Sequence, residues 1–205
     1  MESLICPYHS LPETLANAIL LDRRRQFVDR LQWDLVPTPN GLEIDEYDDV
    51  NSKYLLVHKG EKHLGSCRVR PTSASNMLVD HFLDSFPEAP RFLSMQKGRV
   101  YELTRFCRSP ELEAWESRLV VLSIAALMDR FRHDNQLIGF VAVVFPHVAR
   151  FMDMINMRYL TISKSLFDGR ELLMVCITQA SNFDLEDMTR QEGLFSFPPD
   201  EPIAA

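Results

Sequence analysis

The run Leu137–Phe145 (LIGFVAVVF) is the feature that most limits what this chain can fold into. An uninterrupted apolar run of this length, without alternation, is typical of a strand that is buried on both faces. Pro146 follows the run directly and can begin a helix. The run therefore predicts an internal strand in a sheet whose two faces are both covered.

The rest of the chain mixes strand and helix patterns. Leu15 and Ile19 recur at helical spacing after Ser10-Leu11-Pro12-Glu13, which is typical of a capping box. Gly60-Glu61 and Asp168-Gly169 each separate two strand-like runs, as hairpin turns do. We expect helices near residues 12–31, 77–86, 112–133 and 146–157, and strands near 53–59, 62–70, 99–107, 137–145, 159–163 and 172–178. The sequence predicts an α/β fold, a mixed β-sheet with helices on both faces (an α/β/α sandwich).

Length and composition exclude several classes of protein. The 205 residues fit one domain over residues 1–180, followed by an acidic and proline-rich tail over 181–205 that we expect to be loosely ordered. The net charge of −7 disfavours nucleic-acid binding. The N-terminus has no signal-peptide pattern, and no apolar stretch approaches the ~20 residues of a membrane span. The four cysteines lack zinc-ligand spacing, so we expect no metal and a cytoplasmic location.

A series of charged and aromatic residues carries the clearest functional signal. Its members occur as Arg23-x-x-x-Phe27, Trp33, Asp45-x-x-Asp48, Gly65-x-x-Arg68 and Glu102-Leu103-Thr104-Arg105-Phe106. In this order and at these spacings the series resembles the signature of the acyl-homoserine-lactone synthase (autoinducer synthase) family. The resemblance covers roughly residues 10–178.

The resemblance implies both a fold and a reaction. The family's fold is related to GNAT-type N-acyltransferases, a sandwich in which a cleft splits the sheet. Its members transfer an acyl chain from acyl carrier protein, or in some cases from coenzyme A, to the amino group of S-adenosylmethionine. They then close the lactone and release methylthioadenosine, so S-adenosylmethionine is a substrate and no cofactor is needed.

The residue types suit this chemistry. The sulfonium and ammonium of S-adenosylmethionine call for carboxylates and aromatic faces, and its carboxylate calls for an arginine. Asp45, Asp48, Phe27 and Trp33 can meet the first need, and Arg23 or Arg68 the second. By analogy with the family's strand glutamate, Glu102 is the candidate catalytic proton acceptor, working through a water.

Other interpretations of these residues stay open. Glu102, Arg68 and Arg105 can instead form one structural ion-pair network with the two aspartates, which would still shape the site. Phe27 and Trp33 are by default packing residues. Glu102 and Arg105 also present a geometric problem, because residues three apart on a regular strand point to opposite faces. If both face the cleft, the strand must contain a bulge.

The acyl donor has its own candidate residues. We expect the strand at 137–145 and the following helix to line the acyl pocket, through Phe140, Ala142, Val144 and Met152. This strand has no threonine, which in the family accompanies 3-oxo products, so we expect an unsubstituted acyl chain. Acyl carrier protein is strongly acidic, and the segment 145–170 is locally basic. The candidate docking residues are Arg150, Arg158 and Lys164.

Two rival functions belong to other classes. A GNAT-type acetyltransferase using acetyl-CoA usually has a Gly-x-Gly/Ala turn that cradles pyrophosphate, and none of the seven glycines here forms Gly-x-Gly. A non-catalytic ligand-binding relative is the second rival, which the intact series of charged residues disfavours. The sequence does not indicate an oligomeric state.

Overall fold

The structure is a computed structural model that describes residues 1–167 and 169–180. The predicted loose tail over residues 181–205 lies outside the described residues. The strands are β1 (Glu2–Pro7), β2 (Lys53–Lys59), β3 (Lys62–Pro71), β4 (Val100–Arg108), β5 (Gly139–Val144), β6 (Arg158–Phe167) and β7 (Arg170–Gln179). The α-helices are α1 (Glu13–Arg23), α2 (Ala89–Met95), α3 (Ala114–Asp134) and α4 (Pro146–Met154). The shorter turns are η1 (Tyr8–Ser10), η2 (Arg24–Arg30), η3 (Leu78–Phe82) and η4 (Leu83–Ser85).

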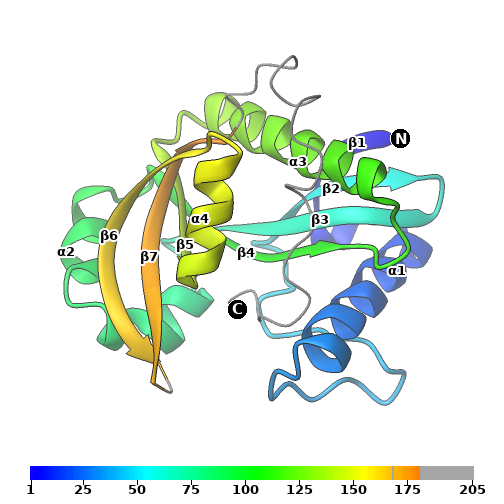
Figure 1. The fold of residues 1–205 in the computed structure, drawn as a ribbon, viewed down its shortest axis with the longest axis horizontal. Coiled ribbons are helices and arrows are strands. Elements are labelled where there is room, and N and C mark those ends of the chain that lie inside the picture. The colour runs from blue at the N-terminus through cyan, green and yellow to red at the C-terminus, as the bar shows by residue number, and fades with distance from the viewer. Residues whose placement is uncertain (168, 181–205) are drawn as a thin grey trace. The chain divides into compact units, whose positions relative to one another are not determined.

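The described strands form one mixed sheet in the order β1-β2-β3-β4-β5-β7-β6 (Figure 1). Strands β4 and β5 are parallel, and the β1–β2, β2–β3, β5–β7 and β6–β7 pairs are antiparallel.

The chain divides into two compact units. Unit 1 contains residues 1–69 and 105–127, and unit 2 contains residues 70–104 and the described residues from 128 onward. The prediction of a single domain over residues 1–180 stays a prediction.

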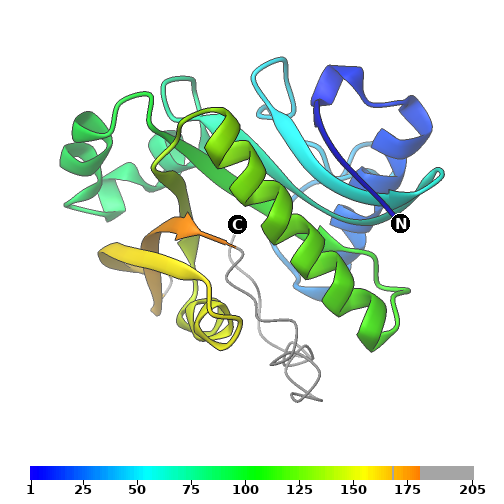
Figure 2. The same cartoon turned by 90° about the horizontal axis from the view of Figure 1, so that it is seen from above.

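In unit 1, two helices cover opposite faces of the β2–β3 hairpin (Figure 2). Leu15 and Ile19 of α1 pack against Tyr54 and Leu56 of β2. On the other face α3 lies so close to β3 that a Cβ atom on Gly65 would come 2.3 Å from a methyl carbon of Val120. The sequence therefore needs glycine at this position for the helix to approach.

In unit 2, the first half of β4 pairs with β5, and β5 with the β6–β7 hairpin. Phe131 of α3 contacts Tyr101 and Phe140 on one face of these strands, at centroid distances of 5.4 and 6.1 Å. Neighbouring strand residues point to opposite faces. The second face is accordingly covered by a core whose buried members are Leu78, Phe86, Ala89, Val100, Val141, Val143, Leu172, Met174 and Cys176.

Several predicted elements differ in detail from the observed ones. The predicted capping box at Ser10 is wrong, because Pro12 is the N-cap of α1 and no side chain caps the helix. The helix expected at 77–86 is instead the π-helical turn η3 followed by the 3-10 turn η4. The helix that begins with α1 widens into a π-helical turn, η2, from Arg24 onward. The two predicted hairpins are confirmed, and so is the buried strand predicted at 137–145, which the structure has at Gly139–Val144.

Candidate active site

Five of the sequence-predicted site residues meet in one buried cluster in unit 1. Arg23 comes from α1, Arg68 from β3 and Arg105 from the second half of β4. Asp45 and Asp48 come from the loop between η2 and β2. We call this set, together with Glu43 of the same loop, the ion-pair cluster. The loop itself was predicted from its acidic sequence, and Glu43, Asp45 and Asp48 turn inward toward the three arginines, whereas Glu46 is exposed.

Arg23 lies at the centre of the ion-pair cluster and is fully buried. Its Nη1 atom donates to both carboxylate oxygens of Asp48, each at 3.0 Å. Its Nε atom donates to Glu43, and Nη1 also donates to the hydroxyl of Tyr54. Each of these partners is itself buried, so the guanidinium exchanges water for charged and polar protein groups.

Arg68 and Arg105 complete the ion-pair cluster from the strands. Arg68 donates to Asp45 at 2.9 Å and to Asp48 at 2.8 Å. Arg105 lies 3.1 Å from Glu43 and 2.9 Å from Asp45, measured between Nη2 and the carboxylate oxygens. Three guanidinium groups therefore face three carboxylates, and the ion-pair cluster balances its own charge.

Burial and charge together fix the protonation states. Burial alone would raise the pKa of Asp48, but Arg23 and Arg68 hold that pKa well below its usual range. Burial by itself would lower the pKa of Arg23, but Tyr54, Asp48 and Glu43 together raise that pKa well above its ordinary value. Burial also raises the pKa of the Tyr54 hydroxyl, and the Asp48 charge adds to this effect. The arginines are cations, the aspartate an anion and the tyrosine neutral at neutral pH.

Aromatic rings border the ion-pair cluster. Phe27 of η2 stacks on Trp33, with ring centroids 4.7 Å apart and an interplanar angle of 15°. The guanidinium carbon of Arg105 lies over the Phe27 ring, 5.6 Å from its centroid. Phe27 is buried, whereas Trp33 is half-buried. The stack therefore extends from the charged core of unit 1 toward its surface.

Strand β4 departs from regular geometry near Arg105. The sequence analysis expected such an irregularity if Glu102 and Arg105 face the same side of the strand. Buried positions alternate at Val100, Glu102 and Thr104, and then change phase, so that Arg105 and Cys107 are buried. Arg105 has a φ of 53°, in the left-handed region that a residue other than glycine rarely adopts. This local departure from a regular strand allows residues three apart to be buried together.

Glu102 lies in unit 2, where the β4–β5 ladder ends. The ladder pairs Val100 with Gly139 and Glu102 with Val141, and its register runs no further. Glu102 is 2% exposed, and its Oε1 atom accepts a hydrogen bond from the backbone N–H of Leu78 at 2.5 Å. The carboxylate is therefore held at the point where the two parallel strands stop pairing.

A small cavity of about 10 Å³ lies beside Glu102 in unit 2. Apart from Glu102 itself it is lined by Met77, Leu78, Phe82, Thr104, Ala142 and Val143. Of the residues predicted for the acyl pocket, Ala142 is in this lining. Phe140 packs on Phe131 instead, Val144 is buried on β5 outside this lining, and Met152 is buried on α4. The cavity combines mostly apolar walls with the carboxylate of Glu102 and the side chain of Thr104.

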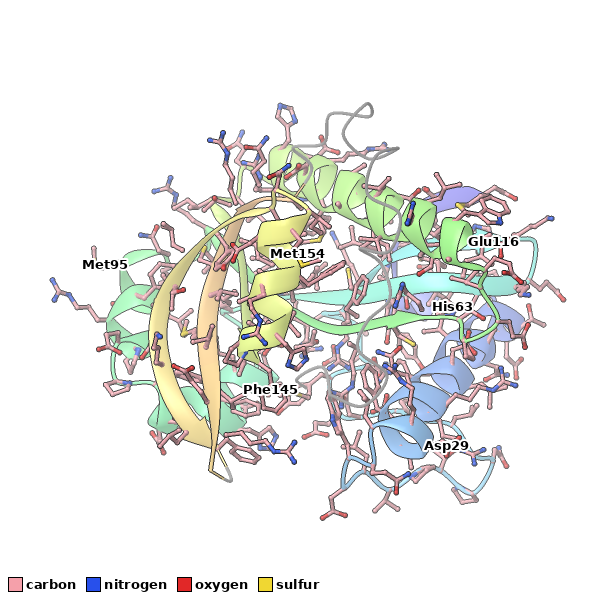
Figure 3. The ribbon with its side chains drawn as sticks, in the orientation of Figure 1. Asp29, His63, Met95, Glu116, Phe145 and Met154 are labelled. Atoms are coloured by element: carbon pink, nitrogen blue, oxygen red, sulfur yellow. The ribbon has the colours of Figure 1, made fainter. Side chains whose placement is uncertain are left out.

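The candidate docking residues are exposed side chains of unit 2. Arg150 lies on α4, and Arg158 and Lys164 lie on β6, the last strand of the sheet order. Lys164 forms an ion pair with Glu171 of β7 at 3.2 Å. Met154, on the same helix as Arg150, is also exposed and is labelled in Figure 3.

Glu43 and Tyr54 are site residues that the sequence interpretation missed. Glu43 bridges Arg23 and Arg105, and Tyr54 donates its hydroxyl to Asp48 at 2.6 Å. The hairpin turn at Gly60-Glu61 gave no signal for Tyr54, because a regular hairpin from this turn would pair Tyr54 with Cys67, and an irregularity between Val57 and His58 shifts the register so that Tyr54 pairs with Arg68. Glu43 had no signal either, since its partners are distant in the sequence.

Other kinds of site find no support in the part of the chain that the structure describes. Within residues 1–167 and 169–180, no group of three or more histidine, cysteine or acidic side chains is arranged to hold a metal ion. Cys6, Cys67, Cys107 and Cys176 are all buried free thiols. None of the described helices is long and apolar enough to cross a membrane.

A family model described as autoinducer synthase matches residues 10–188. The chain belongs to the autoinducer synthase family. This confirms the resemblance on which the site residues were chosen. Among curated proteins, the acyl-homoserine-lactone synthase of Vibrio anguillarum is 30% identical over 132 residues, covering 63% of this chain and 65% of that protein. The chain thus spans slightly less than two thirds of that relative.

Solved structures agree with the family assignment. TofI, crystallised in a ternary complex with an inhibitor and MTA, matches this chain with a TM-score of 0.69 and 25% identity, covering 87% of this chain and 91% of TofI. An acyl-CoA N-acyltransferase from Pseudomonas aeruginosa matches with a TM-score of 0.53 and 12% identity, over 85% of this chain and 98% of that one. The predicted GNAT-like fold is confirmed.

Proposed function

We propose that this autoinducer synthase is an acyl-homoserine-lactone synthase that uses S-adenosylmethionine and an acyl thioester. The amine nitrogen attacks the thioester carbonyl carbon, and the thiol leaves. A carboxylate oxygen of the acylated product then attacks its own γ-carbon, the carbon–sulfur bond breaks, and methylthioadenosine leaves. The observation that carries the proposal is the gathering of the family's charged landmarks into one buried cluster next to an aromatic stack.

Within this proposal, Glu102 acts on the proton of the amine. The ammonium of S-adenosylmethionine must lose a proton before its nitrogen can attack. Glu102 is buried beside an apolar cavity and is oriented by the Leu78 N–H, so one carboxylate oxygen has a fixed position. Water between Glu102 and the amine would carry the proton to the carboxylate. The thioester carbonyl then needs a hydrogen-bond donor for its developing negative charge, which a backbone N–H can supply.

The ion-pair cluster has a different role. Arg23 forms ion pairs with three carboxylates and Arg68 with two, and Asp48 is paired with both arginines, so we assign these residues to shaping the site. Asp45 is the most exposed carboxylate of the cluster, at 12% of its side chain, compared with 3% for Glu43 and 0% for Asp48. Asp45 and the Phe27–Trp33 stack are therefore the groups best suited to meet a cationic substrate.

The acyl donor would use unit 2. We place the acyl chain beside Glu102, at the cavity whose mostly apolar walls include Ala142 of β5. The exposed bases Arg150, Arg158 and Lys164 suit an acidic acyl carrier protein, and acyl-CoA is the other candidate donor. The known complex of TofI with MTA fits a reaction that releases methylthioadenosine. The four reduced, buried cysteines suit a cytoplasmic location.

Expression in a bacterium that makes no lactone signal of its own provides the first test. We expect the culture medium to contain an N-acyl-homoserine lactone with an unsubstituted acyl chain, identified by mass spectrometry. A strain that expresses Glu102→Gln at the same level is the control. Equal amounts of lactone in both media, or a lactone that also appears in the empty-vector strain, would count against the proposal.

A further inference from the structure

A second buried polar arrangement lies in unit 1, outside the ion-pair cluster. Oδ2 of Asp22 on α1 is 2.8 Å from Nδ1 of His63 on β3. Nε2 of His63 is 3.0 Å from the hydroxyl oxygen of Ser66 on the same strand. Asp22, His63 and Ser66 are 5%, 1% and 0% exposed. We call these three residues the polar triad, and His63 is labelled in Figure 3.

A bulge in β3 makes the polar triad possible. Val57 of β2 pairs with Gly65, but the next residue, His58, pairs with His63, so Leu64 is an extra residue in β3. On a regular strand His63 and Ser66, three apart, would point to opposite faces. The extra residue turns both side chains to the face that α1 covers, as bulges next to functional sites often do.

The polar triad has the residue types of a hydrolase triad but not its accessibility. In such enzymes the serine oxygen attacks a substrate carbonyl, so it has to be reachable. Ser66 is fully buried, and its hydroxyl is occupied by His63. Nucleophilic catalysis at Ser66 is therefore excluded in this fold. The three groups instead form a fixed connection between α1 and β3.

This connection holds the helix directly beside the ion-pair cluster. Asp22 immediately precedes Arg23 on α1, and its second oxygen accepts a hydrogen bond from Arg25 at 3.1 Å. The wide turn η2 begins at Arg24 and carries Phe27. Gln26 in that turn donates to the backbone oxygen of Phe106 at 3.1 Å. The end of α1 is thus anchored to β3 by Asp22, and η2 is anchored to β4 by Gln26.

We propose that His63 and Ser66 are positioning residues for S-adenosylmethionine, which act through Asp22 on the end of α1. The polar triad prevents the end of α1 from rotating about its axis or sliding along β3. Arg23 therefore stays in the ion-pair cluster, and Phe27 stays stacked on Trp33. The substrate assignment rests on the proposed function. Neither residue touches the substrate. Loss of the triad lets the end of α1 shift and loosens the wall that meets the substrate's cationic group.

The kinetic test compares four variants. His63→Ala removes both hydrogen bonds, and we expect it to raise the KM for S-adenosylmethionine about tenfold or more, with the KM for the acyl donor within about twofold. His63→Gln keeps one donor and one acceptor, and we expect it to recover most of the loss. Ser66→Ala, the milder change, should raise that KM about threefold. His58→Ala is the matched control, because His58 pairs with His63 but lies outside the triad.

A second readout does not depend on activity. The chain has two tryptophans, and Trp115 is 61% exposed, so Trp115→Phe leaves Trp33 as the single tryptophan, which can be excited selectively. In that background we expect His63→Ala to shift the Trp33 emission to longer wavelength and to increase its quenching by acrylamide, and His63→Gln to reverse both changes. If wild-type protein forms no lactone, the proposed function fails and the fluorescence still tests the triad.

Two results would overturn the positioning role. The first is a folded His63→Ala or Ser66→Ala protein with a lower melting temperature but with unchanged Trp33 emission and unchanged KM for S-adenosylmethionine. The second is an equal loss in His58→Ala, which would show that the effect belongs to the hairpin and not to the triad.

Discussion

The guanidinium of Arg23 donates through one nitrogen to both carboxylate oxygens of Asp48, each at 3.0 Å, and the side chains of both residues are fully buried. Removing two charges from water is costly, and a buried pair persists only where its hydrogen bonds are satisfied. Arg68 and Tyr54 supply those bonds to Asp48. The Arg23–Asp48 pair is therefore the structural centre of the ion-pair cluster, and its neighbours shape the surface that the substrate would meet.

The variant Asp48→Asn tests this central pair. It removes the negative charge that both Arg23 and Arg68 contact most deeply in the core, which should lower the free energy of unfolding by about 3–5 kcal/mol. Urea unfolding of the wild type and the variant at neutral pH measures this difference. Glu46→Gln, an exposed charge in the same loop, is the control and should change stability by less than about 0.5 kcal/mol.

The same variant should also change how stability depends on pH. The folded pKa of Asp48 is depressed, so its contribution to stability is complete above the unfolded value of about 3.9 and is lost as the pH falls toward the folded value. Wild-type stability should therefore fall more steeply than that of Asp48→Asn below about pH 5. Parallel curves in acid would show that Asp48 is not held as a buried anion.

The local parts of the fold could be predicted from the sequence. The turn at Gly60-Glu61 determined the β2–β3 hairpin, and the run Leu137–Phe145 identified the buried strand β5. These features depend on turn geometry and on burial, which a sequence pattern reports directly. The irregularity in β4 was also foreseen, because Glu102 and Arg105 are three residues apart on one strand.

The remaining details depend on tertiary contacts. The residues of η2 are ones that favour an ordinary α-helix, but the turn is π-helical. Gln26 in this turn forms a hydrogen bond to β4, and a contact with so distant a segment cannot be predicted from the local sequence. The prediction of a capping box at Ser10 failed because the N-cap of α1 is Pro12, and no side chain caps the helix. Glu43 was missed because it accepts hydrogen bonds from Arg23 and Arg105, and these three residues come from segments that are distant in the sequence.

Glu102→Gln should separate chemistry from structure. The glutamine Oε1 atom can still accept the Leu78 N–H bond, so the melting temperature should change little, but the side chain can no longer take a proton. We expect kcat to fall by about 10²–10⁴ while the KM for S-adenosylmethionine stays within a few-fold. Steady-state kinetics and a thermal melt measure both effects. Activity within about tenfold of the wild type would remove Glu102 from the role of proton acceptor.

The cavity beside Glu102 should decide which acyl chains fit. Ala142→Phe places a ring in this cavity, so donors with long acyl chains should lose more kcat/KM than donors with short ones. Each methylene that is excluded from the pocket costs about 0.8 kcal/mol, or roughly fourfold. Assays with a series of chain lengths measure the effect, with Ala126→Phe on the exposed side of α3 as the control. An unchanged order of preference would place the acyl chain elsewhere.

Charge reversal tests the proposed docking surface. Arg150→Glu should raise the KM for an acyl-carrier-protein donor at least about fivefold, with a smaller effect at high salt, because exposed charges guide association and are screened by ions. Arg130→Glu, an exposed arginine on α3, is the control. An unchanged KM for the carrier in Arg150→Glu would exclude this surface as the docking site.

The most direct measurement of the central claim uses purified protein, S-adenosylmethionine and an acyl thioester, offered in turn on acyl carrier protein and on coenzyme A. Mass spectrometry would follow the N-acyl-homoserine lactone and methylthioadenosine together. The proposed reaction predicts that both products form in equal amounts with at least one of the donors. An N-acylated product without lactone and without methylthioadenosine, or no product with either donor, would contradict it.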